Sequence, residues 1–227
     1  MTTQHYVFTI DGAAGTGKTT VARELAKRLG TNCLDTGAMY RAIAVISVDH
    51  GVDPEDGVAL AAALEARGVR FDWEQEPPAI LLGGKDVSKR IRDLDISSVV
   101  SIVAKHPEVR KVLVKQQRKI RDDRSMLVAE GRDQGSVVFP DAPVRFFLVA
   151  EMDERTNRRV KQLKQLGSEV ELETVQQDIQ ARDHLDSTRE ASPLICPDGA
   201  IRIDTSNKTI EEVTDIMEDA VRSFLSV

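Results

Sequence analysis

A glycine-rich segment at residues 12–19, directly after the apolar residues 6–10, constrains this chain more than any other feature. It fits the pattern GxxxxGK[ST] in full. Glycines let backbone N–H groups turn inward, and the helix predicted to begin near Gly17 points its positive end to the same place. The segment therefore predicts a loop that binds the phosphates of a nucleoside triphosphate. The predicted contacts come from Gly12, Ala13, Ala14, Gly15, Thr16, Gly17, Lys18, Thr19 and Thr20.

Two side chains of this loop are expected to contact the phosphates and the magnesium ion directly, in addition to the backbone N–H groups. Lys18 is expected to reach the β- and γ-phosphates, and the Thr19 hydroxyl is expected to bind Mg²⁺. Glu130 follows an apolar segment, where an acidic residue would support the magnesium ion. The alternative for Glu130 is a strand-end carboxylate without a role, so the predicted metal ligand is Thr19 alone.

The rest of the chain alternates between short apolar runs and helical periodicity. This alternation predicts a three-layer α/β fold with a five-stranded parallel sheet. Short β-rich runs around turns at 77–78 and 83–84 predict a small antiparallel insertion at 69–87, separate from the parallel sheet. The expected strands of the main sheet are 6–10, 33–34, 126–129, 144–148 and 200–203. The expected helices are 19–29, 38–48, 55–66, 94–104, 107–121, 154–166, 171–186 and 209–225.

Composition is ordinary for a globular protein, with 227 residues, 41% hydrophobic and 30% charged. The net charge of −6 argues against a protein that coats nucleic acid, and no apolar run approaches the roughly 20 residues of a membrane span. Cys33 and Cys196 are the two cysteines, and their separation suggests neither a disulfide framework nor a zinc site. With no signal peptide visible at the N-terminus, we expect a cytoplasmic protein.

Arginines stand where the predicted strands end and the predicted helices begin. Arg132 and Asp133 directly follow the strand expected at 126–129, at the edge where open α/β sheets bind ligands. Arg182, Asp186 and Arg189 are spaced to share one helix face, if the helix extends that far. Taken alone, this trio also fits a solvated, salt-bridged helix, and Arg41 also fits a surface charge. Guanidinium groups suit phosphate because they donate two parallel hydrogen bonds.

Five stretches, in this order along the chain, resemble bacterial cytidylate kinase, a nucleoside monophosphate kinase of the P-loop class. They are Gly-Ala-Ala-Gly-Thr-Gly-Lys at 12–18, Asp-Thr-Gly-Ala-Met-Tyr-Arg at 35–41, Glu-Gly-Arg-Asp at 130–133, Ser-Val-Val-Phe-Pro-Asp-Ala at 136–142 and Arg-Asp-x-x-Asp-x-x-Arg at 182–189. The resemblance covers essentially the whole chain. It implies transfer of a phosphoryl group from ATP to CMP or dCMP, with magnesium as cofactor, by a monomer without nucleic-acid or membrane partners.

The resemblance also implies an organisation and a set of roles. A core at about 1–35, 122–150 and 191–227 would carry an acceptor-binding part at 36–121 and a helical lid at 151–190. Lys18 and Arg132, with the lid residues Arg155, Arg158 and Arg159, would act on the transferring phosphate. The implied CMP contacts are Arg41, Arg132 and Arg189 to the phosphate, Arg182 and Asp186 to the ribose, Ser101, Arg110 and Asp133 to the cytosine, and Thr36 beside the nucleotide.

Elementary chemistry agrees with these roles. Two anionic nucleotides must meet head to head, so several cations are needed, and a phosphate acceptor needs no general base. Cytosine has an N4 amino donor that the Asp133 carboxylate can accept, whereas uracil presents an oxygen there, so UMP should be a poor substrate.

The chain departs from the family pattern at three positions. The family commonly has Ser in place of Thr36, Asp in place of Glu130 and Gly in place of Thr19. Other small P-loop kinases, acting on UMP, AMP or shikimate, remain alternatives. A GTPase-like switch is a more distant one, because residues 207–210, Asn-Lys-Thr-Ile, lack the aspartate of the guanine-binding motif.

Overall fold

The structure of the chain is a computed structural model that describes residues 5–165, 167 and 169–226. Two compact units divide these residues: one comprises the described parts of 1–34 and 124–227, and the other comprises 35–123. Within the described ranges, no helix combines the length and the apolar character needed to span a bilayer.

The first unit is built on the predicted five-stranded sheet, with strand order β2-β6-β1-β7-β8. The strands are β1 (Tyr6–Gly12), β2 (Asn32–Asp35), β6 (Met126–Gly131), β7 (Val144–Val149) and β8 (Ile201–Asp204). The central strand β1 pairs in parallel with β6 and with β7, so that Phe8 lies between Val128 and Val144. Long apolar strands with both edges paired occupy the centre, as a parallel sheet requires.

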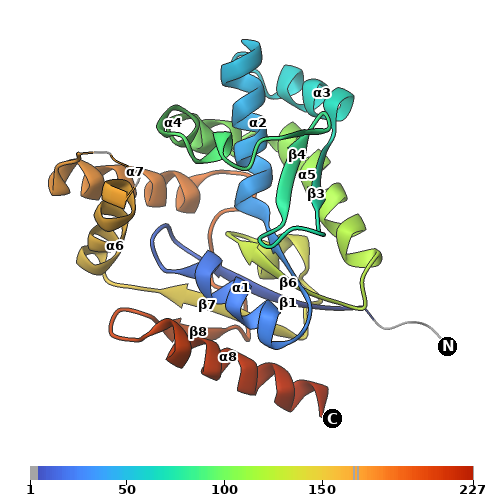
Figure 1. Cartoon of the computed structure of the whole chain (residues 1–227), viewed down its shortest axis with the longest axis vertical. Helices are drawn as coiled ribbons and strands as arrows, with labels where there is room; N and C mark the ends of the chain where they lie inside the picture. Colours follow the sequence, from blue (N-terminus) through green and yellow to red (C-terminus); the bar gives the residue numbers. More distant parts are fainter. Residues whose placement is uncertain (1–4, 166, 168, 227) are drawn as a thin grey trace. The chain divides into compact units, whose positions relative to one another are not determined.

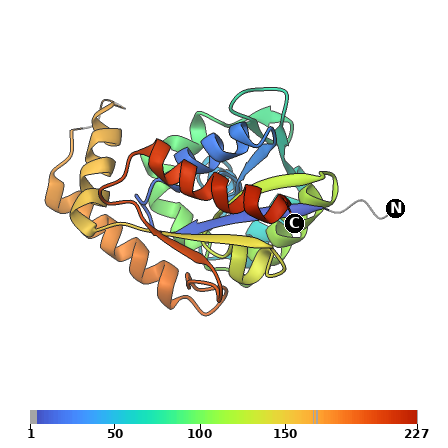
Figure 2. The ribbon, with the colours of Figure 1, turned by 90° about the horizontal axis from the view of Figure 1, so that it is seen from below.

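Helices α1 (Lys18–Arg28) and α8 (Ile210–Leu225) pack side by side on one face of this sheet (Figures 1 and 2). Phe8 and Phe146 from the sheet meet Leu25 of α1 and Met217 of α8 in a fully buried core. Residue Thr209 begins α8 with a capping box, in which its hydroxyl accepts from the Glu212 N–H and Glu212 accepts from the Thr209 N–H.

The other face of β1 carries a short π-helical turn, η2 (Gln134–Val138), that the sequence does not predict. Side chains alternate along a strand, so Thr9 and Asp11 point away from the core that holds Phe8 and Ile10. Two of their neighbours on that face are Gln134 and Gly135, which lie three and four residues after the end of β6.

Helices α6 (Met152–Gln165) and α7 (Leu172–Thr188) form a hairpin with a small core of its own, built on Leu163, Val175 and Ile179 (Figure 2). A helix face shared by Arg182, Asp186 and Arg189 requires a helix that extends to Arg189, and α7 does not extend that far. The helix ends at Thr188, and the backbone of Arg189 is extended, with φ −60° and ψ 140°. The chain turns back here, since the Leu194 N–H donates to the Asp186 carbonyl oxygen at 2.7 Å.

The second unit contains helices and the predicted antiparallel insertion. The insertion is β3 (Val69–Asp72), β4 (Ala79–Leu82) and β5 (Lys85–Asp86), joined between the last two by a Gly83-Gly84 turn. The helices are α2 (Thr36–His50), α3 (Gly57–Arg67), η1 (Arg90–Arg92), α4 (Leu94–Val103) and α5 (Pro107–Asp122). Helix α2 packs on α4 and α3 packs on α5, and Pro107 begins α5 as predicted.

The burial of α8 gives a direct test of this packing. Met217 is fully buried, whereas its neighbour Ile216 is 39% exposed. We expect Met217→Ala to lower the free energy of unfolding by about 2–4 kcal/mol, because it leaves a cavity between α8 and the sheet. Ile216→Ala on the same helix should cost less than about 1 kcal/mol. Urea denaturation of both variants measures the difference, and equal losses would contradict the assigned orientation of α8.

Candidate phosphoryl-transfer site

The phosphate loop connects β1 to α1, as the sequence predicts. Gly12 has φ 155°, and a Cβ there would lie 2.4 Å from the Leu148 carbonyl oxygen of the neighbouring strand. Gly17 has φ 89° and precedes the first turn of α1, which receives no side-chain cap. The two glycines therefore allow a close backbone path that leaves the N–H groups at the start of α1 available to an anion.

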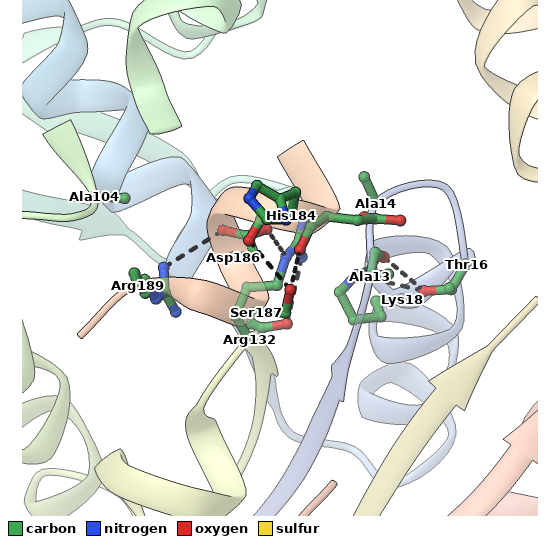
Figure 3. A network of polar contacts seen from close by, with 12 residues as sticks. Ala13, Ala14, Thr16, Lys18, Ala104, Arg132, His184, Asp186, Ser187 and Arg189 are labelled. Carbon is green, nitrogen blue, oxygen red and sulfur yellow. Dashed lines mark hydrogen bonds and ion pairs between the residues drawn. The ribbon is translucent and has the colours of Figure 1, made fainter. Parts of the chain in front are cut away.

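Lys18 is buried at the base of this loop (Figure 3). Its Nζ donates to the Ala13 carbonyl oxygen at 2.7 Å and lies 3.4 Å from the Thr16 hydroxyl. The pKa of Lys18 is lowered to about 7, first by burial and then by the nearby Arg132 charge, against the opposing effect of carboxylates that include Glu130. A desolvated ammonium beside a second cation would be stabilised by a bound polyphosphate.

The residues at the start of α1 fit a magnesium ion. The Thr19 hydroxyl donates to Oε1 of Glu130 at 2.6 Å, so a hydroxyl oxygen and a carboxylate lie together. Oxygen donors are the ligands that Mg²⁺ prefers. Glu130 lies inside β6 rather than after it, because the ladder continues until Asp11 pairs with Gly131.

Arg132, Asp186 and Arg189 form one cluster in the first unit (Figure 3). The Arg132 Nε donates to Oδ2 of Asp186 at 2.8 Å, and an Nη of Arg189 lies 3.5 Å from Oδ1. Burial alone would raise the pKa of Asp186, but Arg132, Arg189 and Arg182 together hold it below its usual value. Asp186 of α7 thus joins Arg132 to Arg189, and Arg189 reaches this cluster from beyond the end of α7.

Arg182 lies near the same cluster, and one nitrogen of its guanidinium group lacks a hydrogen bond. Its Nε is buried without a hydrogen-bond partner, and burial followed by the Arg132 charge lowers its pKa. A guanidinium in this condition would gain from an added acceptor.

The three predicted lid arginines lie on α6, each with its own partner. Arg155 is buried, pairs with the Asp183 carboxylate of α7 and donates to the Ala14 carbonyl oxygen at 3.2 Å. Arg158 pairs with Glu154 at 2.8 Å and donates to the Thr205 carbonyl oxygen at 2.6 Å. Arg159 donates to the Gln162 side-chain oxygen at 2.8 Å.

Three further residues of the first unit were missed by sequence reasoning. Asp183 stands beside Arg182 in the recognised motif, so the motif could have indicated it. Thr205 follows β8, and its hydroxyl donates to the Thr16 carbonyl oxygen at 3.0 Å. Asp11 is fully buried and accepts from the Gln134 and Gly135 N–H groups at 2.8 and 2.7 Å. The residue immediately before a phosphate loop gave no sequence signal of that contact.

The second unit holds the other predicted acceptor contacts. Arg41 of α2 donates to the Ser97 hydroxyl of α4 at 2.9 Å, and Ser101 lies one turn further along the same helix. Arg110 of α5 is buried, donates to the Ala104 carbonyl oxygen at 3.2 Å and stacks 5.3 Å from the Tyr40 ring centroid. Thr36 is the buried first residue of α2. The sequence did not indicate Ser97 or Tyr40 as partners.

Arginines beside a phosphate loop can hold a second phosphate group near the first, as transfer of a phosphoryl group requires. The fold and the site therefore define a P-loop phosphotransferase. The chain belongs to the cytidylate kinase family, whose model, Cytidylate kinase, matches residues 8–223. The family prediction made from the sequence is confirmed.

Individual relatives agree with the family. The cytidylate kinase of Caldanaerobacter subterraneus subsp. tengcongensis is 46% identical over 213 residues, which cover 94% of this chain and 93% of that protein. The cytidylate kinase of Mycolicibacterium paratuberculosis is 43% identical over 216 residues, or 95% of each chain. A solved structure from Chloroflexus aurantiacus has a TM-score of 0.50 and 13% identity, covering 98% of this chain and 99% of that one, which supports the fold alone.

The buried Asp11 predicts a pH dependence of stability. Burial raises its pKa from 3.8 to about 6, and nearby Asp133 contributes, although the Gly135 and Gln134 N–H groups and Lys18 oppose the rise. The native state therefore binds the proton more tightly than the unfolded chain. This contribution to stability is present below about pH 4 and is lost as pH rises through about 6.

Asp11→Asn removes that titration. We expect the free energy of unfolding of the parent to fall relative to that of the variant by about 2 kcal/mol between pH 4 and pH 7. Urea denaturation of both proteins across this range measures it. A difference that stays constant with pH would show that Asp11 keeps an ordinary pKa.

Proposed function

We propose that the protein transfers the γ-phosphoryl group of ATP to CMP and dCMP, giving ADP with CDP or dCDP. The observation that carries the proposal is the cluster of Arg132, Asp186 and Arg189, which lies at the carboxyl end of β6 in the same unit as the phosphate loop. Membership of the cytidylate kinase family over residues 8–223 supports the choice of acceptor.

On the donor side, the N–H groups of residues 12–20 and the Lys18 ammonium would hold the ATP phosphates. Because Lys18 is buried, its ammonium group is already shielded from bulk solvent when a phosphate arrives. The Thr19 hydroxyl, supported by Glu130, would hold Mg²⁺. That ion would neutralise charge on the β- and γ-phosphates.

On the acceptor side, Arg132 and Arg189 would hold the CMP phosphate, with Arg41 as a further contact. Arg182 and Asp186 would bind the ribose hydroxyls. Because Asp186 lies 2.8 Å from Arg132 and 3.5 Å from Arg189, one carboxylate would set the positions of two phosphate-binding groups. The residues proposed for the cytosine are Ser101, Arg110 and Asp133, with Thr36 also beside the nucleotide.

The chemical step needs alignment and charge stabilisation rather than a base, because the acceptor is already a phosphate oxygen. Arg155, Arg158 and Arg159 on α6 would stabilise charge on the transferring group, with residues 151–190 as the lid. Arg155 and Arg158 are partnered by Asp183 and Glu154. When the transferring phosphate replaces Asp183 or Glu154 as the partner of Arg155 or Arg158, it would draw that guanidinium group toward the phosphate.

The proposal includes an organisation and a setting. The core would be residues 1–35, 122–150 and 191–227, and 36–121 would bind the acceptor. We propose a cytoplasmic monomer with nucleotide substrates and no nucleic-acid or membrane partner. Cys33 and Cys196 do not form a disulfide with each other, in keeping with a reducing compartment.

A coupled ADP-release assay across CMP, dCMP, UMP, AMP and shikimate tests the function. We expect kcat/KM for CMP and dCMP to exceed that for UMP by about 10³-fold or more, because uracil would leave the buried Asp133 carboxylate facing an oxygen. The same protein with EDTA in place of magnesium is the control for metal dependence. Turnover of AMP, UMP or shikimate without turnover of CMP would overturn the proposal.

A further inference from the structure

Asp11 uses both of its carboxylate oxygens on one segment of the chain. Oδ1 accepts from the Gln134 N–H at 2.8 Å, and Oδ2 accepts from the Gly135 N–H at 2.7 Å. The side chain is fully buried, so water does not compete for these bonds. Hydrogen bonds from backbone N–H groups to an ionised carboxylate are among the stronger ones in proteins.

This contact connects the phosphate loop, which would bind the donor, to the segment with Arg132, which would bind the acceptor. Asp11 is followed at once by Gly12 and the phosphate loop. Across the parallel ladder Asp11 pairs with Gly131, and Arg132 and Asp133 come next in the chain. A single carboxylate therefore joins the strand that ends in the phosphate loop to the turn that carries Arg132.

A second, independent contact holds the same turn against β1. A Cβ on Gly135 would lie 2.8 Å from the Thr9 hydroxyl oxygen, with Arg145 Cδ and Pro197 Cγ both at 3.2 Å. The backbone of the turn thus approaches β1 more closely than any residue with a side chain allows. The glycine is required by this approach and not by its backbone angles.

A buried carboxylate is a costly way to hold a turn. Burial raises the pKa of Asp11 to about 6, Asp133 faces it with like charge, and Lys18 is the cation nearby that offsets this repulsion. An apolar side chain at this strand position would avoid the desolvation cost of the carboxylate, but it would leave the Gln134 and Gly135 N–H groups without an acceptor. The presence of an aspartate here points to placement of the turn rather than to stability.

We propose that Asp11 is a positioning residue, which fixes Arg132 and Asp133 relative to the phosphate loop and so sets the geometry between acceptor and donor phosphates. It acts through the backbone of residues 134–135. This inference rests on the proposed function, in which Arg132 holds the acceptor phosphate.

The test compares Asp11→Asn with Gly135→Ala. Asparagine keeps the size of the side chain but presents an amide NH₂ to one of the two N–H groups, and alanine at 135 pushes the turn away from Thr9. For both variants we expect the KM for CMP to rise about tenfold or more, and kcat to fall, while the KM for ATP stays within about twofold.

Val221→Ala is the matched control, because Val221 is buried in the core on the opposite face of the sheet. It should lower the melting temperature and leave both KM values within about twofold. Amide hydrogen exchange without nucleotides gives a second readout, in which Asp11→Asn lowers protection at Gln134 and Gly135 by about tenfold or more and leaves residues 21–26 of α1 unchanged.

Unchanged CMP kinetics in both variants, or equal losses for ATP and CMP, would overturn the positioning role. Unchanged exchange at 134–135 in Asp11→Asn would do the same. If the parent phosphorylates another monophosphate and not CMP, the proposed function fails, and the split between acceptor and donor KM is then measured with that acceptor. The exchange experiment needs no acceptor, so the two failures are distinguishable.

Discussion

Repulsion among buried cations is the constraint on which the first unit depends. Arg132 lies close enough to Lys18 and Arg182 to contribute to lowering the pKa of both, and Arg189 joins the same cluster through Asp186. Carboxylates placed among them make the arrangement tolerable: Asp186 pairs with Arg132 and Arg189, and Asp183 pairs with Arg155. Such a set is prepared for phosphates, since each phosphate oxygen that arrives finds donors already desolvated and in place.

The same constraint explains why the backbone around the site is so closely fitted. A Cβ on Gly12 would lie 2.4 Å from the Leu148 carbonyl oxygen, and a Cβ on Gly135 would lie 2.8 Å from the Thr9 hydroxyl oxygen. Two charged groups separated by a movable turn would lose their alignment, and a misplacement of about 1 Å can cost on the order of 10² in rate. Asp11 and the short η2 turn supply rigidity at the place where donor and acceptor residues are adjacent in the fold.

Much of this could be predicted from the sequence, and the exceptions have physical reasons. The strand–loop–helix of residues 6–29, the parallel sheet and the antiparallel insertion follow from periodicity and from glycine spacing. The apolar residues of the η2 turn repeat with neither the period of 2.0 of a strand nor the period of 3.6 of a helix, so periodicity does not predict it. The spacing of Arg182, Asp186 and Arg189 does not show whether the helix reaches Arg189, and the helix ends one residue earlier, at Thr188. Asp11 sits in a strand like any alternating residue, and its partners lie 123 and 124 residues away.

The central claim is that the phosphate loop serves the donor and the arginine cluster serves the acceptor, and calorimetric binding to two variants tests it most directly. Lys18→Ala should weaken ATP binding by about tenfold or more and leave CMP affinity within about threefold, whereas Arg132→Ala should do the reverse. Each titration is run with one nucleotide alone, so chemistry does not intervene. If both variants lose both nucleotides equally, or if Arg132→Ala leaves CMP affinity unchanged, the division into donor and acceptor groups is contradicted.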